Sequence, residues 1–298
     1  MSHSTDDAAS ETLRLIGLPE AETTTSSITY ANWAHLREWI KEALDDSWCV
    51  SYGQVGVGEA TAHALWYLKH KGNSDSPLQI KVYVQSPTDA DGVLDMAASR
   101  RATRRRLANF ITSTDFPIQL IWTRGELDEF GKYSVRYADG GRCIIIAAGQ
   151  TVVEILNDGD SLTAETFEDC ARKLLEQTIR RDGPPLTAPI IKRGPFLSTS
   201  TGNQCHDEHP SKLLVHNVDG RFSLYFELDK PIAAANATTE GYAYIFDKYI
   251  QEVTADSVIV ELKMLTRSVM GSHMVKAHFA DSDTMISRSQ TVEIEVVK

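Results

Sequence analysis

The chain has 298 residues, of which 42% are hydrophobic and 24% are charged, so it is long and apolar enough to bury the cores of two ordinary domains. Its 30 Lys and Arg residues against 41 Asp and Glu residues give a formal net charge of −11. This charge excludes a general attraction to nucleic acid or anionic membranes, and leaves only a local basic patch for such partners. No apolar run reaches the length of a membrane span, and the polar, acidic N-terminus fits no secretory or mitochondrial signal.

Composition shifts divide the chain into four predicted segments. Residues 1–28 are acidic and end in a Thr/Ser run, which is typical of a flexible tail. Residues 29–183 alternate predicted strands and helices, whereas residues 212–298 hold short β-rich runs separated by turn residues. Residues 184–211 are rich in Pro, Gly, Ser and Thr, which predicts a linker or long loop. We therefore expect an α/β N-terminal domain followed by an all-β, sandwich-like C-terminal domain.

The elements expected in the N-terminal domain follow from hydrophobic period and capping residues. In chain order they are a helix over 32–45, a strand over 48–52, a helix over 59–71, a strand over 79–85, a helix over 93–112, strands over 118–123, 133–137 and 142–148, and a helix after Thr163. In the strand over 79–85, Ile80, Val82 and Val84 alternate with polar residues. Thr163 is a suitable N-cap, and the Gly-Pro-Pro run after Asp182 ends that last helix.

The C-terminal region is predicted from its spacing of short strands. These cover residues 222–228, 241–246, 258–264, 273–279 and 291–297. The stretch 271–281 followed by 290–297 resembles the last two strands of immunoglobulin-like domains. That resemblance implies a β-sandwich.

A glycine-rich segment follows the predicted strand over 48–52. Gly53, Gly56 and Gly58 lie between this strand and a predicted helix, where backbone amides hold phosphate in many proteins. Their spacing is not the dinucleotide fingerprint, and the Lys-Ser/Thr pair of a P-loop is missing. A phosphate loop and a purely structural turn both remain open.

The order of elements over residues 45–155 resembles that of phospholipase D-like domains. In that family a His-x-Lys-x4-Asp motif supplies a nucleophilic histidine and a phosphate-binding lysine. The matching segment contains Lys132, but Phe130 stands at the histidine position and Tyr137 at the aspartate position, with Asp139 two residues later. The resemblance therefore implies a degenerate, non-catalytic copy, because the nucleophile is absent.

An arginine cluster is the most unusual feature in so acidic a chain. It places five positive charges within seven residues of the predicted helix over 93–112: Arg100, Arg101, Arg104, Arg105 and Arg106. Residues 100/104 and 101/105 would stack as adjacent rows on one cationic face. This pattern indicates contact with phosphate or carboxylate groups. The alternatives are a solvated surface, or pairing with the chain's own acidic tail.

Two further groups of residues suggest metal chemistry. Asp247, Glu261 and Lys263 follow the outline of a metal-dependent nuclease core, in which two carboxylates and a lysine hold Mg²⁺ and activate water. Metal-capable side chains also gather in a polar segment before and after Pro210, with the weak candidates Cys205, His206, His209 and His216. We expect neither group to bind a resident metal, and we expect no cofactor.

The leading hypothesis is a cytoplasmic, non-enzymatic binding or scaffold protein. Its arginine-rich helix would contact an anionic partner, either nucleic acid or an acidic protein surface, with no membrane partner. Assembly as a homo-oligomer is left open. The alternative is a phosphodiester-acting enzyme, either the metal-dependent nuclease or the degenerate phospholipase D-like domain.

Overall fold

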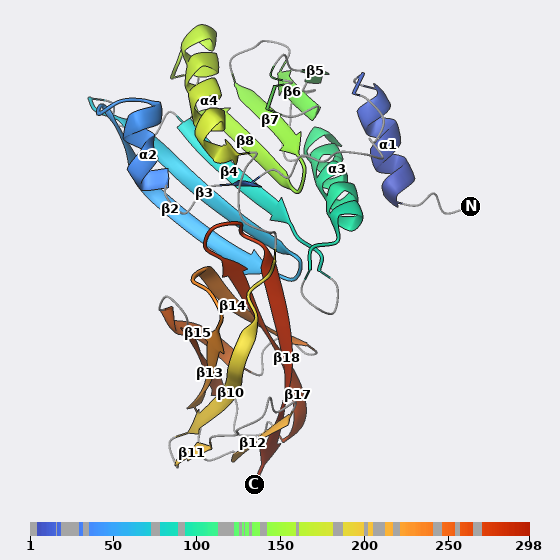
Figure 1. Ribbon diagram of the computed structural model, residues 1–298, viewed down its shortest axis with the longest axis vertical. Helices are drawn as coiled ribbons and strands as arrows, with labels where there is room; N and C mark the ends of the chain where they lie inside the picture. The colour runs from blue at the N-terminus through green and yellow to red at the C-terminus, as the bar shows by residue number, and fades with distance from the viewer. Residues whose placement is uncertain are drawn as a thin grey trace. The chain divides into compact units, whose positions relative to one another are not determined.

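A computed structural model shows the chain as two compact units (Figure 1). The first unit comprises Met1–Val55, His63–Pro87 and Leu94–Pro185, and the second comprises Gly56–Ala62, Thr88–Val93 and Leu186–Lys298. The structure describes residues 5–15, 17–18, 30–31, 36–72, 78–88, 93–112, 122–124, 127, 129–130, 133–137, 142–158, 161–180, 187–199, 202–204, 212–216, 221–240, 246–253, 257–264 and 270–298.

The first unit is built around one large sheet. Its helices are α1 (Thr5–Leu15), α2 (Leu36–Ala43), α3 (Met96–Thr112) and α4 (Ala164–Thr178). Its sheet strands are β2 (Trp48–Gly58), β3 (Thr61–His70), β4 (Leu78–Gln85), β5 (Trp122–Arg124), β6 (Tyr133–Tyr137), β7 (Cys143–Ala148) and β8 (Thr151–Asn157). The short strands β1 (Tyr30–Ala31) and β9 (Ile179–Arg180) pair separately. Among the described residues, no helix is long and apolar enough to cross a membrane.

The prediction of an α/β N-terminal domain is wrong. The sheet order is β2-β3-β4-β8-β7-β6-β5, and the four pairs from β4 to β5 all run antiparallel. An α/β domain needs a parallel sheet with a crossover helix between successive strands. The chain as described is instead mostly β, and β6, β7 and β8 follow one another directly as antiparallel neighbours.

Helices α1 and α3 pack against one face of this sheet. Leu13 of α1 and Leu107 of α3 are buried in one cluster with Val135, Ile145 and Val152 of the sheet. The segment 1–28, expected as a flexible tail, therefore contains a helix with a buried side chain. Helix α4 contacts β8 and α2, and it begins as expected at Thr163, whose hydroxyl accepts a hydrogen bond from the Thr166 amide at 3.3 Å.

The second unit consists of two sheets. One has the order β11-β10-β13-β16-β15 and the other the order β12-β18-β17-β14. The strands are β10 (Ile191–Thr199), β11 (Gly202–Gln204), β12 (Lys212–His216), β13 (Arg221–Leu228), β14 (Ile232–Glu240), β15 (Phe246–Val253), β16 (Ser257–Met264), β17 (Gly271–Asp281) and β18 (Ser287–Val297). Strand β12 runs parallel to β18, and the other paired strands are antiparallel.

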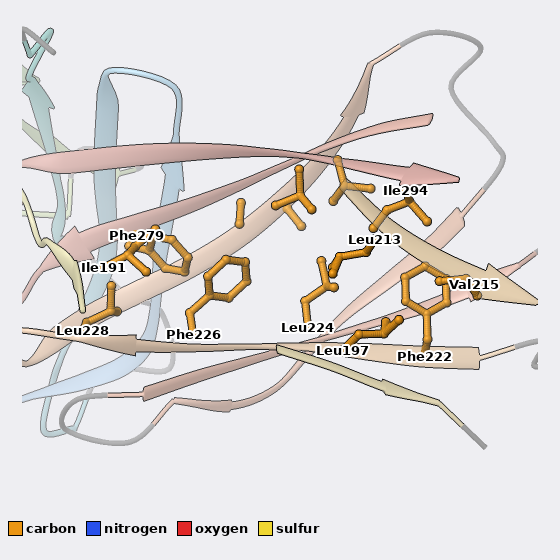
Figure 2. Packing of buried hydrophobic residues seen from close by; sticks show 14 of the residues in the cluster. Ile191, Leu197, Leu213, Val215, Phe222, Leu224, Phe226, Leu228, Phe279 and Ile294 are labelled. Atoms are coloured by element: carbon orange, nitrogen blue, oxygen red, sulfur yellow. The ribbon is translucent and has the colours of Figure 1, made fainter. Parts of the chain in front are cut away.

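A shared apolar core lies between these two sheets. Every second residue of β13 points into it, beginning with Phe222, and Phe279 and Ile294 enter from the other sheet (Figure 2). Two facing sheets with such a core form a β-sandwich. The segment 184–211, expected as a linker, supplies β10 to this sandwich, and Ile191 and Leu197 are buried in its core.

Candidate anion-binding site

Helix α3 is held at its start by local capping and by the sheet. Asp95 precedes the helix, and its carboxylate accepts a hydrogen bond from the Ala98 amide at 2.9 Å. The Ser99 hydroxyl donates to the carbonyl of Gln85 at the end of β4. Thr103 and Leu107 continue the buried side of the helix. The expected helix is therefore confirmed, and the arginines project from a fixed element.

The five arginines do not share one face of α3. Arg101 and Arg105, one turn apart, are exposed, whereas Arg100, Arg104 and Arg106 are half-buried. Residues 104 and 106 lie about 200° apart around the helix axis, so their side chains leave on opposite flanks. The exposed cationic surface is thus narrower than the sequence pattern indicated.

The two half-buried flanking arginines lie over aromatic rings. The guanidinium carbon of Arg106 is 3.6 Å from the centre of the Tyr83 ring and 5.3 Å from that of Phe110. On the other flank, the Arg104 guanidinium carbon lies 5.7 Å from the ring centre of Tyr133. The Nε atoms of Arg104 and Arg106 are buried and have no hydrogen-bond partner among the described residues. Cation–π contacts therefore hold these guanidinium groups in place.

A buried carboxyl group lies next to Arg106. Glu154 of β8 is only 2% exposed and stands opposite Lys81 of β4, with 3.6 Å between Nζ and Oε1. Burial raises the pKa of Glu154, and the charges of Lys81 and Arg106 act in the opposite direction. Its Oε2 atom has no hydrogen-bond partner within the part of the chain that the structure describes. The first unit therefore places one buried acid beside two cations.

His63 of β3 completes this group of side chains. Its ring lies 6.3 Å from that of Tyr83. Burial lowers the pKa of His63 below its ordinary value, and the charge of Arg106 lowers it further. At neutral pH the imidazole is therefore an uncharged planar ring beside a tyrosine.

Helix α1, which packs against the arginine helix, carries acidic side chains. Helix α1 contacts α3, and it carries the exposed side chains of Asp7 and Glu11. The Glu11 carboxylate pairs with Arg14 of its own helix at 2.7 Å, which lowers the pKa of Glu11. The acidic side chains of α1 are therefore an internal source of negative charge near α3, alongside any external ligand.

The glycine-rich segment considered as a phosphate loop lies within strand β2. The chain continues as strand through Gly53, Gly56 and Gly58, and β2 forms a hairpin with β3 where a helix over 59–71 was expected. A Cβ atom at position 53 would come within 2.0 Å of the Trp66 ring, which accounts for that glycine by close packing. No helix N-terminus follows these glycines, so the geometry needed for a phosphate loop is absent at this point of the described chain.

The remaining candidates lie wholly or partly outside the described residues. Strand register places Asp247 directly opposite Lys263, with Glu261 two positions along β16, but nothing is described of these side chains. Lys132, Asp139, Cys205, His206 and His209 lie outside the described residues, and His216 is described only as the last residue of β12. Among the side chains that are described, no three His, Cys, Asp or Glu residues gather as metal ligands would.

Comparisons with known proteins give a weak immunoglobulin-like β signal. No family model and no curated protein matches the chain. A tandem pair of immunoglobulin domains of titin shares 9% identity, covers 83% of this chain and 98% of its own length, and has a TM-score of 0.23. A three-domain titin fragment shares 10% identity over 82% of this chain and 65% of its own, with a TM-score of 0.18. These scores are too low to assign a fold, and nothing supports the phospholipase D-like resemblance.

Sequence reasoning missed the partners of the arginines. Tyr83 and Lys81 lie in a strand that was predicted, on the face opposite the buried Ile80 and Val82. Their alternation alone places an aromatic and a cationic side chain on the less buried face. No pattern in the sequence indicated that Arg106 would contact them, because that contact depends on how α3 packs on the sheet.

Proposed function

We propose that the protein is a non-enzymatic binding protein whose helix α3 contacts an anionic macromolecule. The observation that carries this proposal is the pair of exposed arginines, Arg101 and Arg105, one turn apart on a helix fixed to the sheet. Arginine presents planar donors suited to phosphate and carboxylate groups. Such a pair in a chain of net charge −11 supports a local contact rather than general attraction to anions.

The first prediction concerns polyanion binding. The full-length protein should be retained on heparin, and retention should fall as salt rises. The double variant Arg101→Ser/Arg105→Ser should bind about tenfold or more weakly, because each arginine supplies charge-assisted hydrogen bonds. Its slope of log affinity against log salt should also fall by about 1 to 2. Elution from heparin and a titration at several salt concentrations measure both effects.

A matched variant controls for net charge. Lys41→Ser/Lys192→Ser removes two exposed positive charges that belong to other elements, α2 and β10, and should leave binding nearly unchanged. Asp7→Asn/Glu11→Gln removes negative charge from α1 without removing its buried Leu13. Stronger binding by this variant would identify α1 as an internal competitor. Identical early elution of the wild type and all three variants would overturn the proposal.

Divalent metal separates this proposal from the enzyme alternative. A binding protein should leave labelled DNA and RNA intact in the presence of Mg²⁺ or Mn²⁺. Metal-dependent cleavage that is lost in Lys263→Ala would instead favour the nuclease reading of Asp247, Glu261 and Lys263.

A further inference from the structure

An aromatic face on the first unit adjoins the arginine helix. This aromatic face consists of Tyr52 of β2, His63 and Tyr67 of β3, and Tyr83 of β4. The Tyr52 and Tyr67 rings meet edge to face with centroids 5.8 Å apart, and the His63 and Tyr83 rings are 6.3 Å apart. These contacts place all four rings on the same side of three neighbouring strands.

Within the aromatic face, Tyr52 is exposed and the other three side chains are half-buried. In β3, the even-numbered residues from Ala62 to Leu68 are buried, whereas the odd-numbered residues from Thr61 to Lys69 are only half-buried. Tyr52 is 52% exposed, an unusual position for so large a ring. Tyr83 packs against the core cluster shared by α1, α3 and the sheet, and its ring lies 5.5 Å from that of Phe110. Tyr52 and Tyr67 are therefore the rings of this face that offer a surface to a ligand.

Positive charge surrounds these rings. Lys69 and Lys81 lie on the same side of β3 and β4 as the rings, and Arg106 covers Tyr83. Among the described residues, the carboxylates that contact this side of β4 are both engaged. Glu154 is buried against Lys81, and Asp158 accepts a hydrogen bond from Gln79 at 3.0 Å. The charge on this face therefore complements an anionic ligand.

We infer that the anionic partner is single-stranded nucleic acid, with bases stacking on Tyr52 and Tyr67 and phosphates contacting Lys69 and Lys81. This inference rests on the proposed function and names its ligand class. An acidic protein surface would need the cations but would leave the exposed Tyr52 ring and the half-buried Tyr67 ring unused. A positively charged surface with aromatic side chains matches single strands, whose unstacked bases offer faces to the rings. A duplex keeps its bases stacked and cannot use them in this way.

The test compares ligands and ring variants in the full-length protein. Fluorescence anisotropy measures the binding of four labelled ligands. These are a single-stranded RNA and a single-stranded DNA of mixed sequence, the matching duplex, and polyglutamate as an acidic polypeptide. Single strands should bind more tightly than the duplex or polyglutamate. Tyr52→Leu and Tyr67→Leu should each weaken single-strand binding about tenfold, whereas Tyr52→Phe, which keeps the ring, should bind like the wild type.

The outcomes separate this inference from the proposed function. Binding that depends on Arg101 and Arg105 but favours polyglutamate, or is unchanged in Tyr52→Leu and Tyr67→Leu, would overturn the single-strand inference alone. Absence of binding to every polyanion would overturn both. Circular dichroism of each variant checks folding, and since Tyr52 is largely exposed, its Leu and Phe variants should unfold at the same temperature as the wild type.

Discussion

Replacing Phe226 by alanine is expected to lower the free energy of unfolding of the second unit by about 3–5 kcal/mol. The Phe226 side chain is 0% exposed, and its ring meets Phe279 of the facing sheet edge to face, with centroids 5.1 Å apart. Removing it leaves a cavity between the two sheets and removes an aromatic pair (Figure 2). A loss of this size is a large share of the stability of an ordinary domain.

The distribution of tryptophan makes this measurement selective. All five tryptophans lie in the first unit, at positions 33, 39, 48, 66 and 122. Urea unfolding of the full-length variant should therefore shift the transition seen by far-ultraviolet circular dichroism more than the one seen by tryptophan fluorescence. Tyr225→Ala is the matched control, because this neighbouring ring is half-buried outside the core cluster. Equal losses for both variants would contradict a core shared by the two sheets.

Sequence patterns predicted several elements correctly because hydrophobic alternation and capping within each element determine its structure. The alternation of Ile80, Val82 and Val84 with polar residues is the pattern of β4, and these three residues are buried on one face. Thr163 begins α4, as its capping chemistry indicates. The helix under the arginine cluster also forms where it was expected. In each case the signal lies within one element and needs no tertiary partner.

The hairpin of β2 and β3 could not be predicted in the same way. Residues 59–71 are rich in Ala, Leu and Lys, which favour helix. This composition predicts a helix, although apolar residues also recur at every second position, as in a strand. The structure buries Ala62, Ala64, Trp66 and Leu68 in strict alternation. With a helix predicted here, strands and helices alternate along the chain, and this alternation predicts the α/β class. One wrong element thus contributed to the wrong fold class and to the phosphate-loop hypothesis.

Strand β10 could not be predicted from the sequence for a different reason. Gly194 and Pro195 indicate a break in a strand, yet both lie inside β10, where the register with β13 shifts between Arg193 and Phe196. Gly194 has a φ of 102°, and a Cβ there would come within 2.5 Å of the Tyr225 carbonyl oxygen. Glycine and proline thus mark an irregularity within a strand, which composition alone cannot distinguish from a linker.

Replacing Lys81 by methionine is expected to destabilise the first unit by about 2 kcal/mol or more at neutral pH. The variant keeps the aliphatic stem but leaves the Glu154 carboxylate without its nearest cation. Removing one partner of a fully buried pair costs about 3–5 kcal/mol, and the partial exposure of Lys81 reduces this figure. Urea unfolding followed by tryptophan fluorescence, which reports on the first unit, measures the loss.

The pH dependence of this loss identifies its cause. The pKa of Glu154 is raised in the folded state, so its contribution to stability is fully present below the ordinary carboxyl pKa and is lost as pH rises through the raised value. The charge of Lys81 lowers the pKa of Glu154, so losing this charge raises the pKa of Glu154 in the folded state further. Arg106 and Cys143 still neighbour the Glu154 carboxyl group in the variant. The difference in unfolding free energy between wild type and Lys81→Met should therefore be small in acid and grow as the pH increases.

Two further variants control for the cause. Adding Glu154→Gln to Lys81→Met should remove this increase with pH. Lys69→Met should show no such increase, because Lys69 has no buried acidic partner among the described residues. A difference that stays constant with pH would mean that Lys81 stabilises the unit through packing alone.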